Sequence, residues 1–433
     1  MSDRRLLFVI VMIALALRLL TVVFTYREQL DSRRDHWAFG WETGRIARSV
    51  ALGQGFANPL FEKTGPTAWT TPVYPSFVAG VFKMFGIYTV PSAIVLLSFN
   101  SLFSALTCVP LFLIARETFG RKAAMWAAWG WAFFPPSFYF ASSFIWETCL
   151  TAMLLTSLFW LTIRIEKYSG LAAWAGHGLL WGVIALTTPT AIALLPVLLG
   201  WACMRVHRRG GRWAAKASAV LLVTCITVAP WFVRNLHTFH QFIPFRDTFW
   251  LVAHVGNNGD TRHWDPPEAH PSTSAREQEQ FNRLGELNYM AAKKREVVQY
   301  VVGHPGAFLR TTLRRILFVW TGFWSASSDY LREEPVDPWN ILMSTTLLIC
   351  MLSGIRRGFR EENPLLVPFV LILAIFPAVH YLTIYQPIYR HPIDPEIVIL
   401  AAYGAMDLRS DFCKFRSKMR DTILSIEESK SAS

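Results

Sequence analysis

The stretch LLFVIVMIALALRLLTVVFTY, residues 6–26, decides the fold class of this chain. A helix needs about 20 apolar residues to cross the ~30 Å hydrocarbon core of a bilayer, and this run is long enough. Arg4 and Arg5 precede it, as in a signal peptide, but the run is longer than a typical h-region and no A-x-A-like site follows. We therefore expect an uncleaved first membrane helix.

Similar apolar runs recur along the sequence, of which 53% is hydrophobic and 17% charged. This composition argues against a soluble globular protein. The further expected spans are Pro91–Ala115, Ala123–Ala141, Thr148–Ile163, Leu171–Thr187, Ala191–Met204, Ala214–Phe232, Trp339–Ile355, Pro364–Tyr385 and Ile393–Leu408. The sequence thus predicts an all-α polytopic membrane protein with about ten transmembrane helices.

The basic residues are unevenly distributed between the spans. The loops rich in Lys and Arg are those around Arg116–Lys122, Arg164–Lys167, Arg205–Lys216, Arg356–Arg360 and Arg409–Arg420, and they alternate with loops almost free of them. This is the positive-inside pattern, so the formal net charge of +12 does not indicate a nucleic-acid partner. It predicts cytoplasmic termini and outer loops on the periplasmic side of a bacterial inner membrane.

The first outer loop, residues 27–86, contains WAFGWETGRIARSVALGQGFANPLFEKTGPTAWTTPVYP at residues 37–75. It is denser in tryptophan, charge and turn residues than a simple connection requires. Within it, Glu42–Leu52 is expected to form a short helix that the glycines of GQG end. The segment YPSFVAGVFKMF, residues 74–85, is short for a span and is expected to be an interfacial or re-entrant helix.

A second large outer loop covers residues 234–325. Its polar helix begins with a capping box formed by Ser274 and Glu277, and its charges suit a water-facing helix. The segment Ala307–Trp324 is expected to be an amphipathic interfacial helix, with Arg310, Arg314 and Arg315 on the face opposite Leu313, Leu317 and Trp320. One membrane domain over residues 1–420 and a disordered cytoplasmic tail over 421–433 complete the expected organisation.

Acidic residues at the outer membrane face are the candidate catalytic groups. Glu42 begins the short helix and could act as a general base, or could only complement the helix dipole. Asp35 competes with it for the same role. Glu147 begins an apolar span, where a carboxylate is costly unless it faces a polar cavity or reaches the interface.

Basic and aromatic residues of the outer loops are the candidate binding groups. Arg390 is a basic residue in a short outer loop, where the positive-inside pattern predicts few Lys or Arg. An arginine there could bind a phosphate, although a salt bridge with Asp394 or Glu396 is an equal alternative. The further phosphate candidates are His391, Arg246 and Arg234. The candidates for sugar or acceptor binding are Trp41, Trp69, Tyr74 and Tyr389.

Metal binding has little support in the sequence. The six cysteines form no CxxC pair. The acidic and histidine residues of the second outer loop, Asp260, His263, Asp265, Glu268 and His270, have mixed spacing and more often face solvent than hold a cation. We therefore assign no metal site and no cofactor apart from a donor substrate, and the sequence leaves open whether the protein needs a divalent metal.

Five stretches together resemble the GT-C membrane glycosyltransferases. They are ETGRIARSVALGQGF with GPTAWTTPVYP, the region of Glu147, APWFVRNLHTFHQFIPFRD with VGNN, LGELNYMAAKKREVVQYVVGHPGAF, and IYRHPIDPEIVILAAYG. Their order is similar to that in dolichyl-phosphate-mannose protein mannosyltransferases and bacterial aminoarabinose transferases. The resemblance implies a GT-C-like helical bundle with interfacial helices in its outer loops.

The same resemblance implies a polyprenyl-phosphate sugar as donor and transfer on the outer face to a lipid, glycan or protein acceptor. It places Glu42 as the base and Glu147 as the residue that positions or activates the acceptor. The family usually has an Asp-Glu type pair at the helix start, and WET at residues 41–43 offers only Glu42, so Asp35 stays an alternative. A transporter or flippase of lipid-linked sugars is the alternative function, although its spans should carry more charge.

Overall fold

The computed structural model describes residues 2–31, 39–61, 63–168, 170–259, 267–322 and 337–407. All its regular elements in these ranges are helices; an isolated bridge between Ala57 and Pro66 is the nearest approach to a sheet. The helices up to the middle of the chain are α1 (Asp3–Thr25), α2 (Glu42–Ala51), α3 (Val73–Phe85), α4 (Val90–Leu106), α5 (Cys108–Ala132), α6 (Pro135–Ser143), α7 (Thr148–Arg164), α8 (Leu171–Ala185), α9 (Leu195–Arg208) and α10 (Trp213–Phe239).

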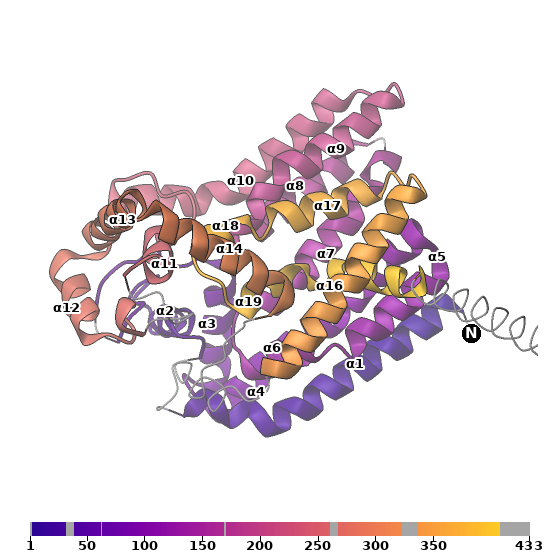
Figure 1. Cartoon of the computed structure of the whole chain (residues 1–433). Coiled ribbons are helices and arrows are strands. Elements are labelled where there is room, and N and C mark those ends of the chain that lie inside the picture. The colour runs from indigo at the N-terminus through magenta and orange to yellow at the C-terminus, as the bar shows by residue number, and fades with distance from the viewer. Residues whose placement is uncertain are drawn as a thin grey trace, which may run out of the picture.

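The remaining helices divide between the second outer loop and the C-terminal part of the bundle. They are α11 (Phe249–Gly256), α12 (Ala275–Leu284), α13 (Glu286–Gly303), α14 (Pro305–Thr321), α16 (Asp337–Arg360), α17 (Leu366–Ile375), α18 (Ala378–Leu382) and α19 (Pro387–Arg390), followed by a helix over residues 394–407. Figure 1 shows the long helices side by side, with α2, α11, α12 and α13 gathered at one end of the bundle.

Six helical stretches are long and apolar enough to cross a membrane within the described ranges. They are Asp3–Leu30, Val90–Ala132, Thr148–Lys167, Pro189–Arg208, Trp213–Phe239 and Pro338–Arg360. Val73–Phe85, Leu171–Ala185 and Leu366–Leu382 are apolar but shorter. The chain is therefore an integral membrane protein of all-α class, as the sequence predicts, although the expected number of ten spans is not confirmed.

The interior of the bundle is filled by large apolar side chains and provides hydrogen-bond partners for the one charged residue in the apolar part of its first helix. Trp131, Trp174 and Trp181 are fully buried. Arg18 is also fully buried, and its guanidinium donates hydrogen bonds to Ser104 Oγ at 2.8 Å and Ser137 Oγ at 2.6 Å. A cation at membrane depth is costly without such partners, so Arg18 ties α1 to α4 and α6.

The basic loops gather at the other end of the bundle, around the start of α1. Arg121 Nε lies 2.7 Å from Asp3 Oδ1, Arg205 Nε lies 2.8 Å from Glu166 Oε2, and Arg360 Nη2 lies 3.0 Å from Asp407 Oδ1. Loops from distant parts of the sequence thus meet on one face. The bundle separates a basic end from the end that holds α2 and α11–α13.

The helices of the second outer loop occur close to where the sequence predicts them, but some of the faces that they bury differ from the prediction. Ser274 caps α12 by accepting a hydrogen bond from the Glu277 amide at 3.4 Å, which is one half of the predicted capping box. The Glu277 carboxylate binds Tyr289 and Lys293 instead of closing the box. The expected single polar helix is instead two helices, because Gly285 adopts φ 73° between α12 and α13. Its charges do not all face water, since Glu277 and Lys293 are buried and pair at 2.7 Å.

The predicted faces of α14 are wrong at Arg315. This guanidinium is buried and donates to the Gly256 carbonyl, at the C-terminal end of α11, and to Asn257 Oδ1 at 3.1 Å. Leu313 and Leu317 are exposed on α14 instead. The last carbonyls of a helix lack internal partners, so Arg315 supplies the hydrogen bonds that α11 cannot make itself.

Candidate active site

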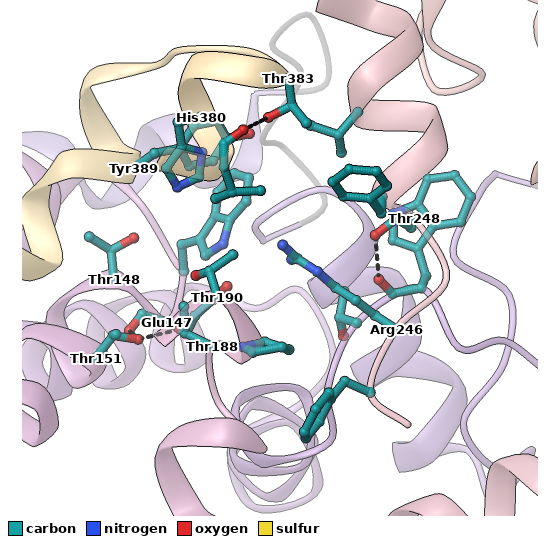
Figure 2. A pocket seen from close by; sticks show the side chains of 18 of the residues that line it. Glu147, Thr148, Thr151, Thr188, Thr190, Arg246, Thr248, His380, Thr383 and Tyr389 are labelled. Carbon is teal, nitrogen blue, oxygen red and sulfur yellow. Dashed lines mark hydrogen bonds between the residues drawn. The ribbon is translucent and has the colours of Figure 1, made fainter. Parts of the chain in front are cut away.

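A cavity of about 360 Å³ lies where the outer loops meet the ends of the apolar helices. Its walls come from the start of α2, the loop around Trp69, the start of α7, the segment after Thr187, the loop into α11, and the segment from Phe376 to Pro392. Figure 2 shows how these segments surround the cavity. Its size falls within the ~300–1,000 Å³ of small-molecule sites.

Glu42 lies on the cavity wall, where three side chains surround its carboxylate. Ser272 Oγ donates to Glu42 Oε1 at 2.6 Å, and Arg45 Nη1 lies 3.9 Å from the same oxygen. His270 Nδ1 accepts a hydrogen bond from the Ser272 amide at 3.1 Å, which assigns the proton of a neutral ring to Nε2. That Nε2 lies 3.9 Å from Glu42 Oε1. The carboxylate is thus held by donors from α2 and from the second outer loop.

The backbone before Glu42 is strained. Phe39, Gly40 and Trp41 have φ values of 58°, 86° and 50°, a region that residues other than glycine rarely adopt. For Phe39 and Trp41 such conformations cost on the order of 1–3 kcal/mol each, and they cluster at functional sites. The strain turns the chain sharply into α2 and fixes where its first carboxylate lies.

Glu147 lies on the same cavity, immediately before α7. Its neighbour Trp146 packs edge-to-face against Trp41, with ring centroids 4.9 Å apart. Burial raises the pKa of Glu147 above its ordinary value, while the positive charge of Arg246 and a hydrogen bond from Trp146 act in the opposite direction. The two predicted carboxylates therefore line one cavity, although they are 105 positions apart in the sequence.

Arg246 is the cation of this cavity. It lies in the loop that leads into α11, and Figure 2 shows its side chain extending into the middle of the space. Within the described part of the chain, no hydrogen bond or ion pair of its guanidinium is found. The site thus combines two carboxylates with a guanidinium that is available to an anionic ligand.

Several wall residues were not singled out from the sequence. Hydroxyl groups are supplied by Thr148, Thr151, Thr188, Thr190 and Thr248, and the Thr151 and Thr188 hydroxyls lie 2.6 Å apart. His380 stacks on Tyr389 with ring centroids 4.7 Å apart, and its buried Nδ1 has no hydrogen-bond partner in the described residues. A histidine within the apolar run FPAVHYL was the available signal for this group.

The aromatic candidates divide between the cavity wall and the interior. Trp69 and Tyr389 line the cavity. Trp41 is instead packed between Trp146 and Phe144. Tyr74 is buried and donates a hydrogen bond to Asn100 Oδ1 at 2.9 Å, so its hydroxyl ties α3 to α4.

Three of the four phosphate candidates lie away from the cavity wall. Arg390 is buried, with Nε 2.9 Å from Asp394 Oδ1 and Nη1 donating to the Val319 carbonyl at 2.7 Å. His391 Nδ1 contacts the other Asp394 oxygen at 3.0 Å. Arg234 donates to the carbonyls of Thr67 and Phe56, each at 2.7 Å. The donor groups of Arg390, His391 and Arg234 thus already bind backbone carbonyls and Asp394, so these side chains stabilise the fold.

The remaining predictions about the site concern Asp35 and metals. Asp35 lies outside the described residues, as do Asp260, His263 and Asp265. Among the residues that are described, no group of three or more His, Cys, Asp or Glu side chains could hold a metal ion. Glu42 is thus the candidate base whose surroundings the structure defines.

Comparisons with known proteins agree with this architecture. Residues 69–233 match the family model of dolichyl-phosphate-mannose-protein mannosyltransferase. No curated protein matches the chain significantly. The segment that matches the family model contains Trp69 and Glu147 but not Glu42 or Arg246.

Two structures of the Archaeoglobus fulgidus oligosaccharyltransferase share the fold. The complex with Zn and sulfate has a TM-score of 0.55 at 15% identity, over 96% of this chain and 51% of that chain. The apo form has the same TM-score of 0.55 at 14% identity, over 96% and 52%. The present chain thus spans about half the length of that protein.

A third structure is less similar. ArnT from Cupriavidus metallidurans, bound to undecaprenyl phosphate, aligns over 90% of this chain and 77% of that chain at 13% identity, with a TM-score of 0.39. The match to the mannosyltransferase family model and the likeness to the oligosaccharyltransferase nevertheless confirm the resemblance expected from the sequence: this chain has the GT-C fold of membrane glycosyltransferases.

Proposed function

We propose that this protein is a glycosyltransferase that moves a sugar from a polyprenyl-phosphate donor to a hydroxyl or amine of an acceptor. The observation that carries the proposal is the cavity in which Glu42, Glu147 and Arg246 meet at the ends of apolar helices. A polyprenyl chain is too apolar to leave the bilayer, so an enzyme that uses it must hold its site at the membrane surface. The match to a family named for a dolichyl-phosphate donor supports this choice.

Glu42 is the proposed general base. It takes the proton of the acceptor while the acceptor oxygen or nitrogen forms a bond to the anomeric carbon of the donor sugar. The bond between that carbon and the phosphate oxygen breaks, and polyprenyl phosphate leaves. The position of Glu42 beside Ser272 and His270 supports this role, since a base must be held within hydrogen-bonding reach of the proton that it removes.

Glu147 is the proposed acceptor-positioning residue. Glu147 and Glu42 both line the cavity, and the segments that carry them are joined by the contact between Trp41 and Trp146. Because its pKa is raised, Glu147 is protonated to a greater extent than an exposed carboxyl group at the same pH. A carboxyl group in this place can therefore donate or accept a hydrogen bond with the acceptor while Glu42 performs the proton transfer.

Arg246 is the proposed ligand of the donor phosphate. Charge develops on the bridging oxygen as the phosphate departs, and a guanidinium already in place stabilises it. Of the four cations considered from the sequence, Arg246 is the one on the cavity wall. In this proposal it carries the role alone, and Arg390, His391 and Arg234 are structural.

The threonines and the size of the cavity support a donor with a small glycan. Thr148, Thr188 and Thr190 present hydroxyls that can hydrogen bond with a sugar, and Trp69 and Tyr389 present rings on which it can stack. A volume of about 360 Å³ suits one sugar ring with its phosphate better than a long oligosaccharide. We place the site on the outer, periplasmic face, with both termini cytoplasmic, because of the charge distribution.

A transfer assay in proteoliposomes tests the proposal. The parent protein is incubated with polyprenyl-phosphate monosaccharides that carry a radiolabelled sugar and with total envelope glycans and lipids as acceptors. We expect labelled product from the parent, and at least about a hundredfold less from Glu42→Gln, because general base catalysis contributes typically 10²–10⁴-fold. A single displacement further predicts inversion at the anomeric carbon.

The matched control is Glu279→Gln, which removes an exposed carboxylate on α12. It should transfer sugar at the parent rate. Transfer at the parent rate by both Glu42→Gln and Glu147→Gln would refute the site. A product with retained anomeric configuration would refute the single displacement.

A further inference from the structure

A second pair of acidic residues lies behind the cavity wall and is not used by the proposed chemistry. Glu286, the first residue of α13, accepts hydrogen bonds from Thr67 Oγ1 at 2.5 Å and from the Ala68 amide at 2.6 Å. Asp247 approaches the same place from the loop before α11, and its amide donates to the Ala68 carbonyl at 3.2 Å. The two acidic residues thus meet at one turn of the first outer loop.

This junction joins the two segments that carry Trp69 and Arg246. The Trp69 amide donates to Thr67 Oγ1 at 3.0 Å, and the Thr248 hydroxyl donates to the Trp69 carbonyl at 3.3 Å. Trp69 follows the turn that Glu286 holds, and Arg246 directly precedes Asp247. Both Trp69 and Arg246 line the cavity, so movement at the junction would displace two of its walls.

The Asp247 carboxyl group has an unusual partner. Within the described residues, neither of its buried oxygens accepts a hydrogen bond from a hydroxyl or a guanidinium. Its side-chain contact is instead the Glu286 carboxyl group. Two buried carboxylates repel each other strongly, whereas a single proton between them makes the contact a hydrogen bond.

The electrostatics of the junction agree with a shared proton. Burial and the charge of Asp247 raise the pKa of Glu286 well above its ordinary value. Burial raises the pKa of Asp247 to about 6. Both shifts favour a proton that is retained between the two carboxyl groups.

The other charged groups around the pair have partners of their own. Arg234 on α10 interacts electrostatically with Glu286, and its guanidinium donates hydrogen bonds to the Thr67 and Phe56 carbonyls. One turn further along α13, the Tyr289 hydroxyl donates to Glu277 Oε2 at 2.7 Å, and Lys293 pairs with the same oxygen. No described hydrogen bond or ion pair of these groups neutralises Asp247.

We infer that Asp247 and Glu286 form a proton-sharing carboxyl pair that positions Trp69 and Arg246 across the cavity, and that this pair comes apart when its proton is lost. Glu286 is thus a positioning residue, since it acts on the reaction through the turn at Thr67 and Ala68. The kinetic part of this inference rests on the proposed function, but the proton-sharing pair does not.

Replacing Glu286 by Gln tests the pair, because an amide reproduces the protonated carboxylic acid. Its NH₂ can donate to Asp247 and its oxygen can accept from Thr67 or Ala68, at every pH. Both carboxyl pKa values are raised in the folded protein, so the stability from the pair is present below the ordinary carboxyl pKa of about 4 and is lost as pH rises through the raised values. The melting temperature of the parent in detergent should therefore fall towards alkaline pH more steeply than that of Glu286→Gln.

Hydrogen–deuterium exchange locates the effect without any substrate. After correction for the intrinsic effect of pH, exchange in residues 56–70 should rise towards alkaline pH in the parent and stay low in Glu286→Gln. In the transfer assay, the alkaline limb of the rate profile should move to higher pH in this variant, with a change in donor KM. Glu279→Gln on α12 is the control and should follow the parent in all three measurements.

A second variant covers the case in which Glu286→Gln fails to fold. Asp247→Asn removes the charge that repels Glu286, and it should likewise flatten the pH dependence of melting and of exchange. Identical pH dependence in the parent and in a folded variant of either kind would overturn the inference. If the parent itself transferred no sugar, only the proposed function would be refuted, because the melting and exchange measurements would still show whether the carboxyl pair exists.

Discussion

The backbone of Gly40 lies directly against the carbonyl oxygen of Ile145: a Cβ atom added to Gly40 would be 2.0 Å from that oxygen. Ile145 stands two residues before Glu147, and Gly40 stands two residues before Glu42. This contact brings the two candidate carboxylates onto one cavity. It also explains why a residue without a side chain occurs in the strained turn before α2.

Replacing Gly40 by Ala should therefore separate the two carboxylates. The positive φ costs an L-residue on the order of 1–2 kcal/mol, and the clash with Ile145 adds to it because backbone must move. We expect a lower melting temperature and a loss of sugar transfer that exceeds the loss of folded protein. Gly53→Ala is the control, since Gly53 also has positive φ, 75°, but nothing lies within 4 Å of its added Cβ. Equal effects of the two substitutions would contradict the role of the contact.

Arg246 and Arg390 should respond to substitution in opposite ways. Removing Arg246 leaves no charge partner unpaired in the described residues, so Arg246→Ala should fold normally and lose about 10²–10³-fold in kcat. Removing Arg390 leaves Asp394 buried without its main counter-charge, which typically costs about 3–5 kcal/mol of stability. Thermal unfolding and transfer rates of the two variants separate these effects. Normal stability of Arg390→Ala together with lost donor binding would restore it as a phosphate ligand.

Ser272 should support catalysis through Glu42. Its hydroxyl donates the 2.6 Å hydrogen bond to the Glu42 carboxylate, and hydrogen bonds to charged groups contribute about 1.5–3 kcal/mol. Ser272→Ala should lower kcat about tenfold or more while leaving the donor KM nearly unchanged, because Arg246 and the threonine wall are untouched. Steady-state kinetics in proteoliposomes measure both constants. Thr273→Ala, at the exposed neighbouring position, should keep the parent kcat; a drop of equal size there would show that any change in this turn has the same effect.

Arg315 should stabilise the fold more than its neighbour does. Arg315→Ala leaves the terminal carbonyl of α11 and Asn257 without their donor, and each unsatisfied buried group costs about 1–3 kcal/mol. Arg314 is exposed, so Arg314→Ala should change the melting temperature little. A scan of thermal unfolding for both variants in detergent decides the point. Equal melting temperatures would contradict the assignment of Arg315 as a helix cap.

The fold class and the first wall of the site could be predicted because local signals determine them. Length and apolarity identify the spans, and the glycines of GQG end α2 close to where expected, at Ala51. Glu42 was a candidate because it begins a short helix within a charged outer loop, and Glu147 because a carboxylate on an apolar helix is costly unless it faces a polar cavity or reaches the interface. These arguments use only neighbouring residues.

The rest of the site depends on which distant segments pack together. Sequence alone does not show which outer-loop arginine faces the cavity. Arg390 is directed away from it by its ion pair with Asp394 and its hydrogen bond to the Val319 carbonyl, which belongs to a distant segment. The contributions of His270, Ser272 and His380 likewise need segments that meet only in three dimensions. Arg315 was misassigned because helical periodicity shows which residues share a face, but not which face the protein covers.

A glycosyltransferase with Glu42 as its base must break the bond between the sugar and the polyprenyl phosphate. Mass spectrometry of the lipid measures this directly in proteoliposomes that contain the purified protein, a polyprenyl-phosphate monosaccharide and acceptor. We expect free polyprenyl phosphate to appear with the parent and Glu279→Gln proteins and not with Glu42→Gln. A donor lipid that stays intact with the parent protein while it moves between the two leaflets would show that the protein is a flippase instead.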